Sequence, residues 1–184
     1  MAFNPSIPPA IRTSLDVAIW FLDRARSDDS HLPFQKLHRL LYLAQSLYAA
    51  QKGSLLMPAM FLAEEIGPSE PNIYRLLADG RPEEILIETP TGQIRDFLEL
   101  VWDRYGHMSI DRQNELIATN RAYVETRRGY VIDTAAMAAA IVAPTAQAER
   151  VQRILRSQNG APVTVRAWSP LPAGDAPGKT KAKS

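Results

Sequence analysis

Apolar residues recur every three or four positions along most of the chain, a spacing that places them on one face of a helix. The spacing is especially clear in residues 14–25 and 34–52. Thr13 or Ser14 can cap the first of these helices, and Gly53 is a typical stop for the second. The pattern therefore predicts a mainly α-helical protein.

Further helices follow from the same signals. Residues 94–106 repeat the helical spacing and end at a glycine. Pro71 suits the first turn of a short helix, Ser109 and Asp133 can each cap another, and residues 144–160 again carry apolar positions on one face. Together these segments predict a compact bundle of helices.

One passage has the character of a strand. Ile85, Leu86 and Ile87 form a short run rich in β-branched residues, and the "TPTG" that follows Glu88 has the composition of a turn. We therefore expect a small β-hairpin arm near residues 84–93.

Proline, glycine and lysine divide the chain into three parts. Residues 1–12 are rich in proline and are predicted to be extended. Residues 13–160 carry the helical pattern and are predicted to form a single domain, because a chain of 184 residues buries one sizeable core. Residues 161–184 allow a short strand and then a tail rich in proline, glycine and lysine, which is predicted to be partly disordered.

Composition narrows the classes of protein that fit. The chain has no cysteine, which excludes disulfides, thiol catalysis and thiolate metal sites. Its formal charge of +1 gives no overall field that would attract nucleic acid or an anionic membrane. No window approaches the roughly 18 apolar residues of a membrane span, and the N-terminus lacks the pattern of a signal peptide. We therefore expect a soluble, cytoplasmic protein with no membrane partner.

The sequence shows no catalytic or metal-binding pattern. The histidines His31, His38 and His107 are widely separated, and no HExxH motif is present. Glu64 and Glu65 are adjacent, but neighbouring helix residues point about 100 degrees apart and do not share a site. The glycine patterns of nucleotide-binding loops are also absent. We therefore expect a protein that is not an enzyme and that uses no cofactor and no metal.

Basic side chains form three modest clusters: the helix with Lys36, His38 and Arg39, the segment 121–128, and the last lysines of the chain. Acidic residues lie close to most of them, so binding of nucleic acid is not favoured. A nucleic-acid-binding regulatory protein is the alternative prediction, and its sign would be salt-dependent retention on DNA.

The passage Gly67-Pro68-Ser69-Glu70-Pro71 separates two apolar segments that resemble helices. Gly67 permits a positive φ, Pro68 interrupts a helix, and Ser69 can cap a new helix that starts at Pro71. The passage therefore predicts a rigid corner. Two interpretations are open: the corner is purely structural, or it exposes Ser69 and Glu70 beside the basic helix as a recognition edge.

Three segments occur together in a recognisable order. Residues 36–45, "KLHRLLYLAQ", are similar to the "KLQKLLYYAQ" helix of the Panacea domain family, which includes the SocA-like antitoxins. Residues 67–74, "GPSEPNIY", are similar to the family's "GPVVPxVY", and "VWDRYG" followed by Ser109 is similar to its "VWxxYGxxS". The resemblance covers residues 14–125.

The resemblance implies a mainly α-helical fold and an antitoxin that binds and neutralises a cognate, co-encoded protein toxin. The SocA-like branch further implies a proteolytic adaptor that delivers the toxin to a AAA+ protease of the ClpXP type. The family implies no catalytic residues. Its "YGPVV" and "THxxxPW" motifs are altered here, so contacts with the partner are expected to differ.

We predict that the partner is bound by residues of the basic helix and of the corner. These residues are Lys36, Arg39, Tyr42, Gly67, Pro68, Glu70 and Tyr74. The substitutions Arg39→Glu and Glu70→Arg are expected to weaken toxin binding without unfolding the domain.

Overall fold

Helices account for most of the structure, as the sequence predicts. The computed structural model describes residues 3–81, 86–142, 154–156 and 162–164. The helices are α1 (Ser14–Ser27), α2 (Phe34–Lys52), α3 (Pro71–Leu76), α4 (Gly92–Val101), the π-helical turn η1 (Trp102–Gly106), α5 (Ile110–Ala118), α6 (Arg121–Glu125) and α7 (Thr134–Val142). The strands are β1 (Leu62–Glu64), β2 (Gly67–Ser69), β3 (Ile154–Arg156) and β4 (Pro162–Thr164).

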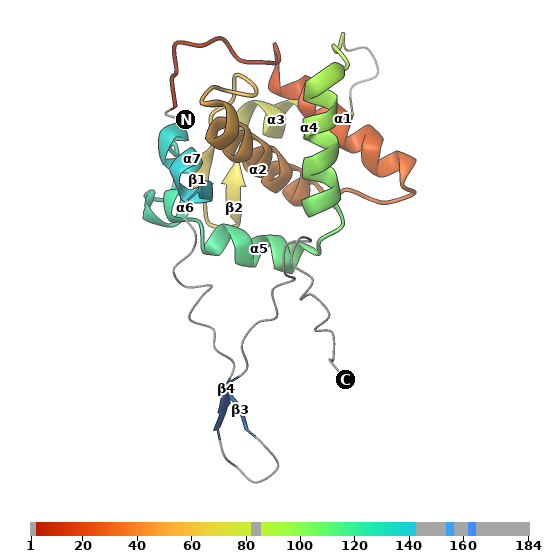
Figure 1. The fold of residues 1–184 in the computed structure, drawn as a ribbon. Helices are drawn as coiled ribbons and strands as arrows, with labels where there is room; N and C mark the ends of the chain where they lie inside the picture. The colour runs from red at the N-terminus through yellow and green to blue at the C-terminus, as the bar shows by residue number, and fades with distance from the viewer. Residues whose placement is uncertain (1–2, 82–85, 143–153, 157–161, 165–184) are drawn as a thin grey trace, which may run out of the picture. The chain divides into compact units, whose positions relative to one another are not determined.

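Helix α2 runs through the middle of the helical unit (Figure 1). It contacts α1 and α4 on one side, α7 on the other, α5 across one end, and strand β2. Every residue from 37 to 49 is buried. The helix ends where Gly53 adopts the left-handed conformation with φ of 69°, which confirms the predicted stop. Because α2 is enclosed on several sides, its polar side chains must find partners inside the protein.

The helix starts follow the capping signals of the sequence. Thr13 Oγ1 accepts a hydrogen bond from the Asp16 backbone N–H at 3.1 Å, and its hydroxyl donates to Asp16 Oδ2 at 2.7 Å. Ser109 Oγ accepts from the Arg112 N–H at 3.2 Å, and Asp133 Oδ1 accepts from the Ala136 N–H at 2.8 Å. Each cap satisfies an N–H that has no partner within its helix, so the predicted starts are confirmed.

The N-terminal segment lies along the chain that follows α2 (Figure 1). Asn4 N–H donates to the Gly53 carbonyl at 2.7 Å, Ala10 N–H to the Leu55 carbonyl at 3.0 Å, and Ile11 N–H to the Leu56 carbonyl at 2.8 Å. These bonds fix residues 4–11 to the body of the protein before α1 begins.

The hairpin expected near residues 84–93 is wrong in position. Residues 86–91 form neither strand nor helix, Gly92 begins α4, and residues 82–85 lie outside the described residues. The hairpin is instead β1 with β2, paired antiparallel with Ala63 opposite Pro68. The apolar segment at β1 was expected to resemble a helix. It is a strand because it has pairing partners on both edges, which local propensity does not reveal.

The second edge of β1 is covered by residues 129–132. Ala63 N–H donates to the Tyr130 carbonyl, and Gly129 N–H donates to the Ala63 carbonyl, both at 2.9 Å. Since the polar groups of Ala63 point to this side, its pairing with Pro68 is a pair without hydrogen bonds between the strands. Pro68 therefore loses no ladder bond through its missing N–H, which explains how proline fits a strand here.

A second compact unit comprises residues 144–184, and the first unit ends at Ala143. Its described residues are β3 and β4, which pair antiparallel with Leu155 opposite Val163. The helix predicted over residues 144–160 is therefore wrong at 154–156, and the rest of that segment lies outside the described residues. Backbone pairing between the two strands has overridden the helical spacing.

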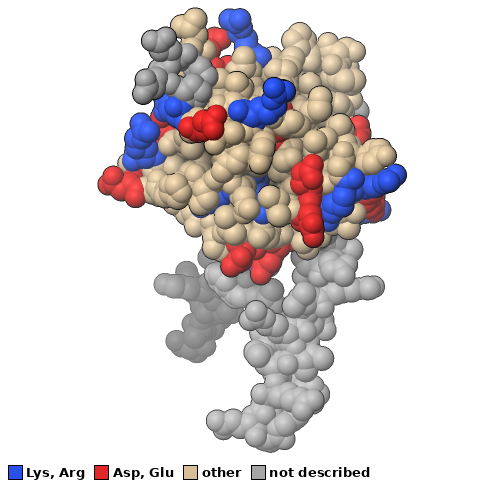
Figure 2. Space-filling model, turned by 180° about the vertical axis from the view of Figure 1, so that it is seen from behind, with Lys and Arg blue, Asp and Glu red and all other residues tan. Residues whose placement is uncertain are grey.

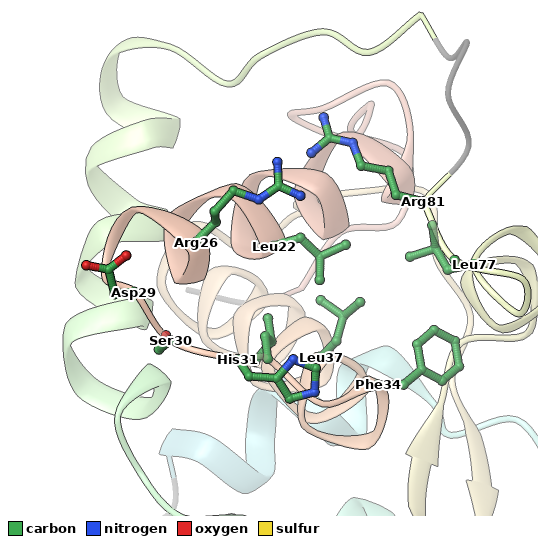
Figure 3. Close-up of a pocket in the computed structure, with 11 residues that line it drawn as sticks. Leu22, Arg26, Asp29, Ser30, His31, Phe34, Leu37, Leu77 and Arg81 are labelled. Carbon is green, nitrogen blue, oxygen red and sulfur yellow. The ribbon is translucent and has the colours of Figure 1, made fainter.

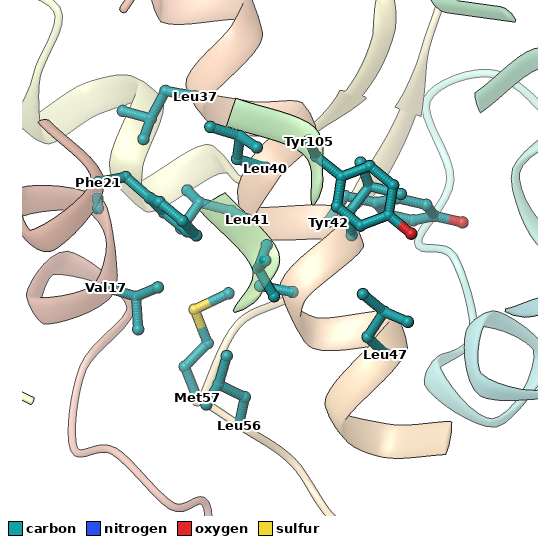
Figure 4. Close-up of a cluster of buried hydrophobic side chains, with 14 of the residues drawn as sticks. Val17, Phe21, Leu37, Leu40, Leu41, Tyr42, Leu47, Leu56, Met57 and Tyr105 are labelled. Atoms are coloured by element: carbon teal, nitrogen blue, oxygen red, sulfur yellow. The ribbon is translucent and has the colours of Figure 1, made fainter. Parts of the chain in front are cut away.

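The core lies around α2 and is mainly apolar, with Val17 and Phe21 of α1 beside Leu37 and Leu41 of α2 (Figure 4). Gln45 is a fully buried exception. Its Oε1 accepts from the backbone N–H groups of the two residues at positions 56 and 57, each at 3.2 Å. The side chain therefore holds the chain that leaves α2 against the helix.

None of the helices in the described part of the chain combines the length and the apolar character that crossing a membrane requires.

The turn η1 depends on a close contact between a glycine and a tryptophan. Trp102 is 1% exposed, and its Nε1 donates to Asp28 Oδ2 at 2.8 Å. A Cβ atom at Gly106 would lie 2.5 Å from Cδ2 and Cε3 of the Trp102 ring. The ring has buried neighbours, including Phe21 with ring centroids 6.4 Å apart, so it has little room to move.

We expect Gly106→Ala to lower the free energy of unfolding by about 1 to 3 kcal/mol, even though alanine favours a helix more than glycine does. Urea unfolding followed by tryptophan fluorescence measures the change. Gly80→Ala is the control, since Gly80 has φ of +97° but open space around a Cβ, and so it reports backbone strain alone. A Gly106→Ala protein as stable as wild type would contradict the packing argument.

Candidate functional site

A cleft of about 660 Å³ opens between the first turns of α2, the β1–β2 hairpin and α3. We call it the α2–hairpin cleft. Its lining residues are Phe34, Gln35, His38, Arg39, Leu62, Glu64, Glu65, Ile66, Gly67, Pro68, Ser69, Pro71, Tyr74 and Arg75. Four of the seven residues predicted to bind a partner, Arg39, Gly67, Pro68 and Tyr74, therefore lie in one cleft. Their role in binding stays a prediction.

Arg39 ties α2 to the hairpin from inside the protein. Its side chain donates from Nη1 to the Gln35 carbonyl at 2.8 Å and from Nη2 to the Ile66 carbonyl at 2.5 Å. Arg39 is only 3% exposed, and burial lowers the pKa of its guanidinium. Among the residues that the structure describes, none forms an ion pair with it.

Gly67 is required by the approach of that guanidinium. It has φ of +126°, and a Cβ atom there would lie 3.3 Å from Arg39 Nη2. The residue therefore needs both the conformational freedom and the small size of glycine. The sequence predicted a rigid corner between two helix-like segments here, whereas the structure places Gly67 at the start of strand β2, where the backbone passes close to a buried cation.

Glu70 is a buried structural residue rather than an exposed contact. It is fully buried, and its backbone N–H donates to His38 Nδ1 at 3.0 Å. Its carboxylate accepts from the Ile73 N–H at 2.6 Å and from Asn72 Nδ2 at 3.0 Å, so Glu70 caps α3. The expectation that Ser69 caps this helix and that Glu70 is exposed is wrong.

The burial of Glu70 also changes what its substitution would test. Glu70→Arg would remove the cap of α3 and place a cation where no solvent reaches. The same reasoning applies to Arg39→Glu, since that side chain is enclosed and bonded to two carbonyls. Neither substitution separates partner binding from folding, so residues with exposed side chains have to carry that test.

Tyr42 and Lys36 do not line the cleft. Tyr42 is fully buried one helical turn beyond His38 on α2, where its hydroxyl donates to Asn120 Oδ1 at 3.0 Å and burial raises the pKa of that hydroxyl. Asn120 Oδ1 also accepts from the Tyr123 N–H at 3.3 Å and so caps α6. Lys36 is partly buried, and desolvation lowers the pKa of its ammonium group. Tyr42 therefore has a structural role in the interior rather than an exposed side chain that could contact a partner.

An aromatic wall, of which the sequence assigned only Tyr74 to the site, closes one side of the cleft. The Phe34 and His38 rings lie 4.6 Å apart in a T-shaped arrangement, and the Phe34 and Tyr74 rings lie 5.6 Å apart. Phe34 and His38 are four residues apart on α2, a spacing that could have indicated the pair. Tyr74 is 58% exposed and Ile66 is 63% exposed, so both present apolar surface at the rim.

A second cavity, of about 580 Å³, lies beside α1 and α3 (Figure 3). Leu22, Leu37 and Leu77 form its apolar floor. The arginines at its edge, Arg26 and Arg81, are exposed to solvent, and Arg81 pairs with Asp23. Its charged groups are thus already hydrated or paired, which distinguishes this cavity from the α2–hairpin cleft.

Basic and acidic side chains are mixed on the face shown in Figure 2. Within the described ranges, several arginines are paired with acids, such as Arg24 with Glu99 and Arg121 with Glu125. The described residues also contain no group of three His, Asp or Glu side chains placed to hold a metal ion. Mixed charge of this kind supplies no continuous basic track for a nucleic-acid backbone.

Comparisons with models of known families, with curated proteins and with solved structures find no match to this chain. The resemblance to the Panacea domain family therefore stays a prediction that rests on the three sequence segments.

The environment of His38 predicts a specific pH dependence of stability. Burial, with a smaller effect of the Arg39 charge, lowers the pKa of His38 from 6.5 to about 4. Between these values the unfolded chain binds a proton that the folded protein does not, so stability falls as the pH falls from 6.5 towards 4. His38 is 4% exposed, so the loss should reach about 2 to 3 kcal/mol.

His38→Asn removes the titrating group and keeps an oxygen that can accept from the Glu70 N–H. Between neutral pH and pH of about 4.5, we expect wild type to lose about 2 kcal/mol more of its free energy of unfolding than this variant loses. Urea unfolding at both pH values gives the difference. His31→Asn, at an exposed position, is the matched control. Parallel losses in wild type and His38→Asn would overturn the assignment.

Proposed function

We propose that this protein is an antitoxin, which binds and neutralises a protein toxin encoded beside it, and that the rim of the α2–hairpin cleft is the contact surface. One observation carries the proposal. Two of the segments that resemble the Panacea domain family, residues 36–45 and 67–74, come together at a single cleft. Segments separated in sequence that build one concave surface are typical of a recognition site.

The rim has the surface chemistry of a protein contact. Ile66 of the hairpin and Tyr74 of α3 both line the cleft and expose apolar surface to solvent. Tyrosine is enriched among the residues that dominate the free energy of binding in protein interfaces. The rim is also held rigidly, since the Ile66 carbonyl is bonded to Arg39 and α3 is capped by Glu70. A surface that is already ordered loses little conformational entropy when a partner binds.

Delivery of the toxin to a ClpXP-type protease is the finer form of this proposal. An adaptor needs a second contact besides the toxin site, and tethering by an additional segment raises the effective concentration of the bound toxin at the protease.

Affinity capture of the tagged protein from its own cells, with and without active protease, distinguishes delivery to the protease from simple sequestration of the toxin. Retention of one small protein with a AAA+ unfoldase supports the adaptor, and retention of the small protein alone supports sequestration.

The alternative, a nucleic-acid-binding regulator, has less support from the described surface. Lys36 and Arg39 belonged to the basic cluster that motivated it, and Arg39 is enclosed rather than exposed. In the cleft the acids Glu64 and Glu65 offset the cations Arg39 and Arg75, so its lining carries no excess of positive charge for a phosphate backbone. Recovery of nucleic acid instead of protein in the capture experiment would reverse this preference.

Substitutions at the rim test the contact surface without disturbing the interior. We expect Ile66→Ser and Tyr74→Ala each to weaken binding of the co-encoded toxin about tenfold or more, because both remove exposed apolar contacts. Calorimetric titration with the purified toxin, and rescue of growth in cells that express it, measure the effect.

Leu100→Ser is the matched control for these variants. Leu100 is 49% exposed on α4 and does not line the cleft. The Leu100→Ser variant should bind the toxin with the affinity of wild type. Circular dichroism and urea unfolding check that all three variants are folded. If the rim variants are folded and bind with wild-type affinity, the rim is not the contact surface.

A further inference from the structure

Two hydrogen-bond donors beside the α2–hairpin cleft have no acceptor among the residues that the structure describes. His38 Nε2 and Arg39 Nε are both buried and form no hydrogen bond with these residues. His38 Nδ1 accepts from the Glu70 N–H, so the proton of the neutral ring is on Nε2, which makes that nitrogen a donor. Buried donors without acceptors are rare in folded proteins because each costs free energy. Two on adjacent residues of one helix call for a specific explanation.

The charge of Arg39 adds a second requirement. Its guanidinium reaches two backbone carbonyls, which are dipoles rather than counter-charges. Within the described part of the chain it has no carboxylate partner. A buried cation without a counter-ion is costly, and a carboxylate oxygen would satisfy both the charge and the free Nε–H group.

The cleft itself indicates the rest of the ligand. Its volume of about 660 Å³ lies within the range of small-molecule sites. Phe34, Leu62 and Tyr74 supply apolar walls next to the two donors. Glu64 and Glu65 line the cleft together with the cations Arg39 and Arg75, so the formal charges of its lining balance and do not favour a ligand with several negative charges, such as a nucleotide. A single carboxylate on an apolar body fits these surroundings.

We propose that the α2–hairpin cleft binds a small organic acid, whose carboxylate accepts a hydrogen bond from Arg39 Nε close to His38 and whose apolar or aromatic body packs against Phe34 and Tyr74. Both nitrogens are shielded from solvent, so the ligand enters when a ring of the aromatic wall rotates. Tyr74 is the mobile candidate, since it is 58% exposed and its ring centroid lies 6.3 Å from that of His38. This site goes beyond toxin binding, and its test uses no toxin.

The experiment titrates the full chain, at neutral pH, with 3-phenylpropionate and separately with 3-phenylpropanamide, its uncharged counterpart. Nuclear magnetic resonance of the arginine Nε–H and histidine Nε2 signals follows binding. We expect the acid to bind at least about tenfold more tightly than the amide, because hydrogen bonds to a charged group are the stronger ones. The Arg39 Nε and His38 Nε2 signals should shift with the acid and not with the amide.

Arg39→Lys removes the Nε–H group while keeping the charge, and should weaken binding of the acid about tenfold or more. Arg26→Lys, at an exposed position in the other cavity, should bind as wild type does. If Arg39→Lys does not fold, the resonance shifts of the wild-type protein decide the question alone. Equal binding of acid and amide, or no binding of the acid up to about 10 mM, would overturn the proposal.

Discussion

His38 and Arg39, adjacent on α2, hold the hairpin and α3 in place through hydrogen bonds to the backbone. His38 accepts from the N–H of Glu70, and Arg39 donates to the carbonyl of Ile66. Each strand of the hairpin has only three residues, so the strand pairing by itself gives little stability. The bonds from α2 are made away from water, and breaking either would leave a buried polar group without a partner. The cleft therefore has its shape because two polar side chains of a core helix face the hairpin.

Local signals predicted the helices well and the strands poorly, for one physical reason. The caps at Thr13, Ser109 and Asp133 are bonds between residues three apart, so a short stretch of sequence contains both partners. The strand character of β1 depends on pairing with residues 129–132, far along the chain. No window around Ala63 contains that information, and its apolar pattern fits a helix equally well.

The candidate site was found in part, and the errors have a common origin. Residues of the segment 67–74, which the strong backbone preferences of Gly67 and Pro68 made conspicuous in the sequence, line the α2–hairpin cleft. Glu70 and Tyr42 were predicted to contact a partner because they lie in the two segments that resemble the Panacea domain family. Their partners, the helix α3 backbone and Asn120, are visible only in the folded chain. The sequence also contained no sign that His38 accepts a hydrogen bond, because the donor, the Glu70 N–H, lies 32 residues along the chain.

The pairing of β1 with residues 129–132 has a consequence for the order of synthesis. All the residues that line the cleft lie between positions 34 and 75, yet one edge of β1 stays unpaired until the segment around Ile132 has been made. At typical rates of translation the roughly 60 intervening residues take about 3 to 12 s. During that interval the nascent chain presents an unpaired strand edge next to apolar side chains. Such an edge can pair with a strand of another chain and lead to aggregation. The finished protein removes this hazard itself, because its own later segment occupies the edge.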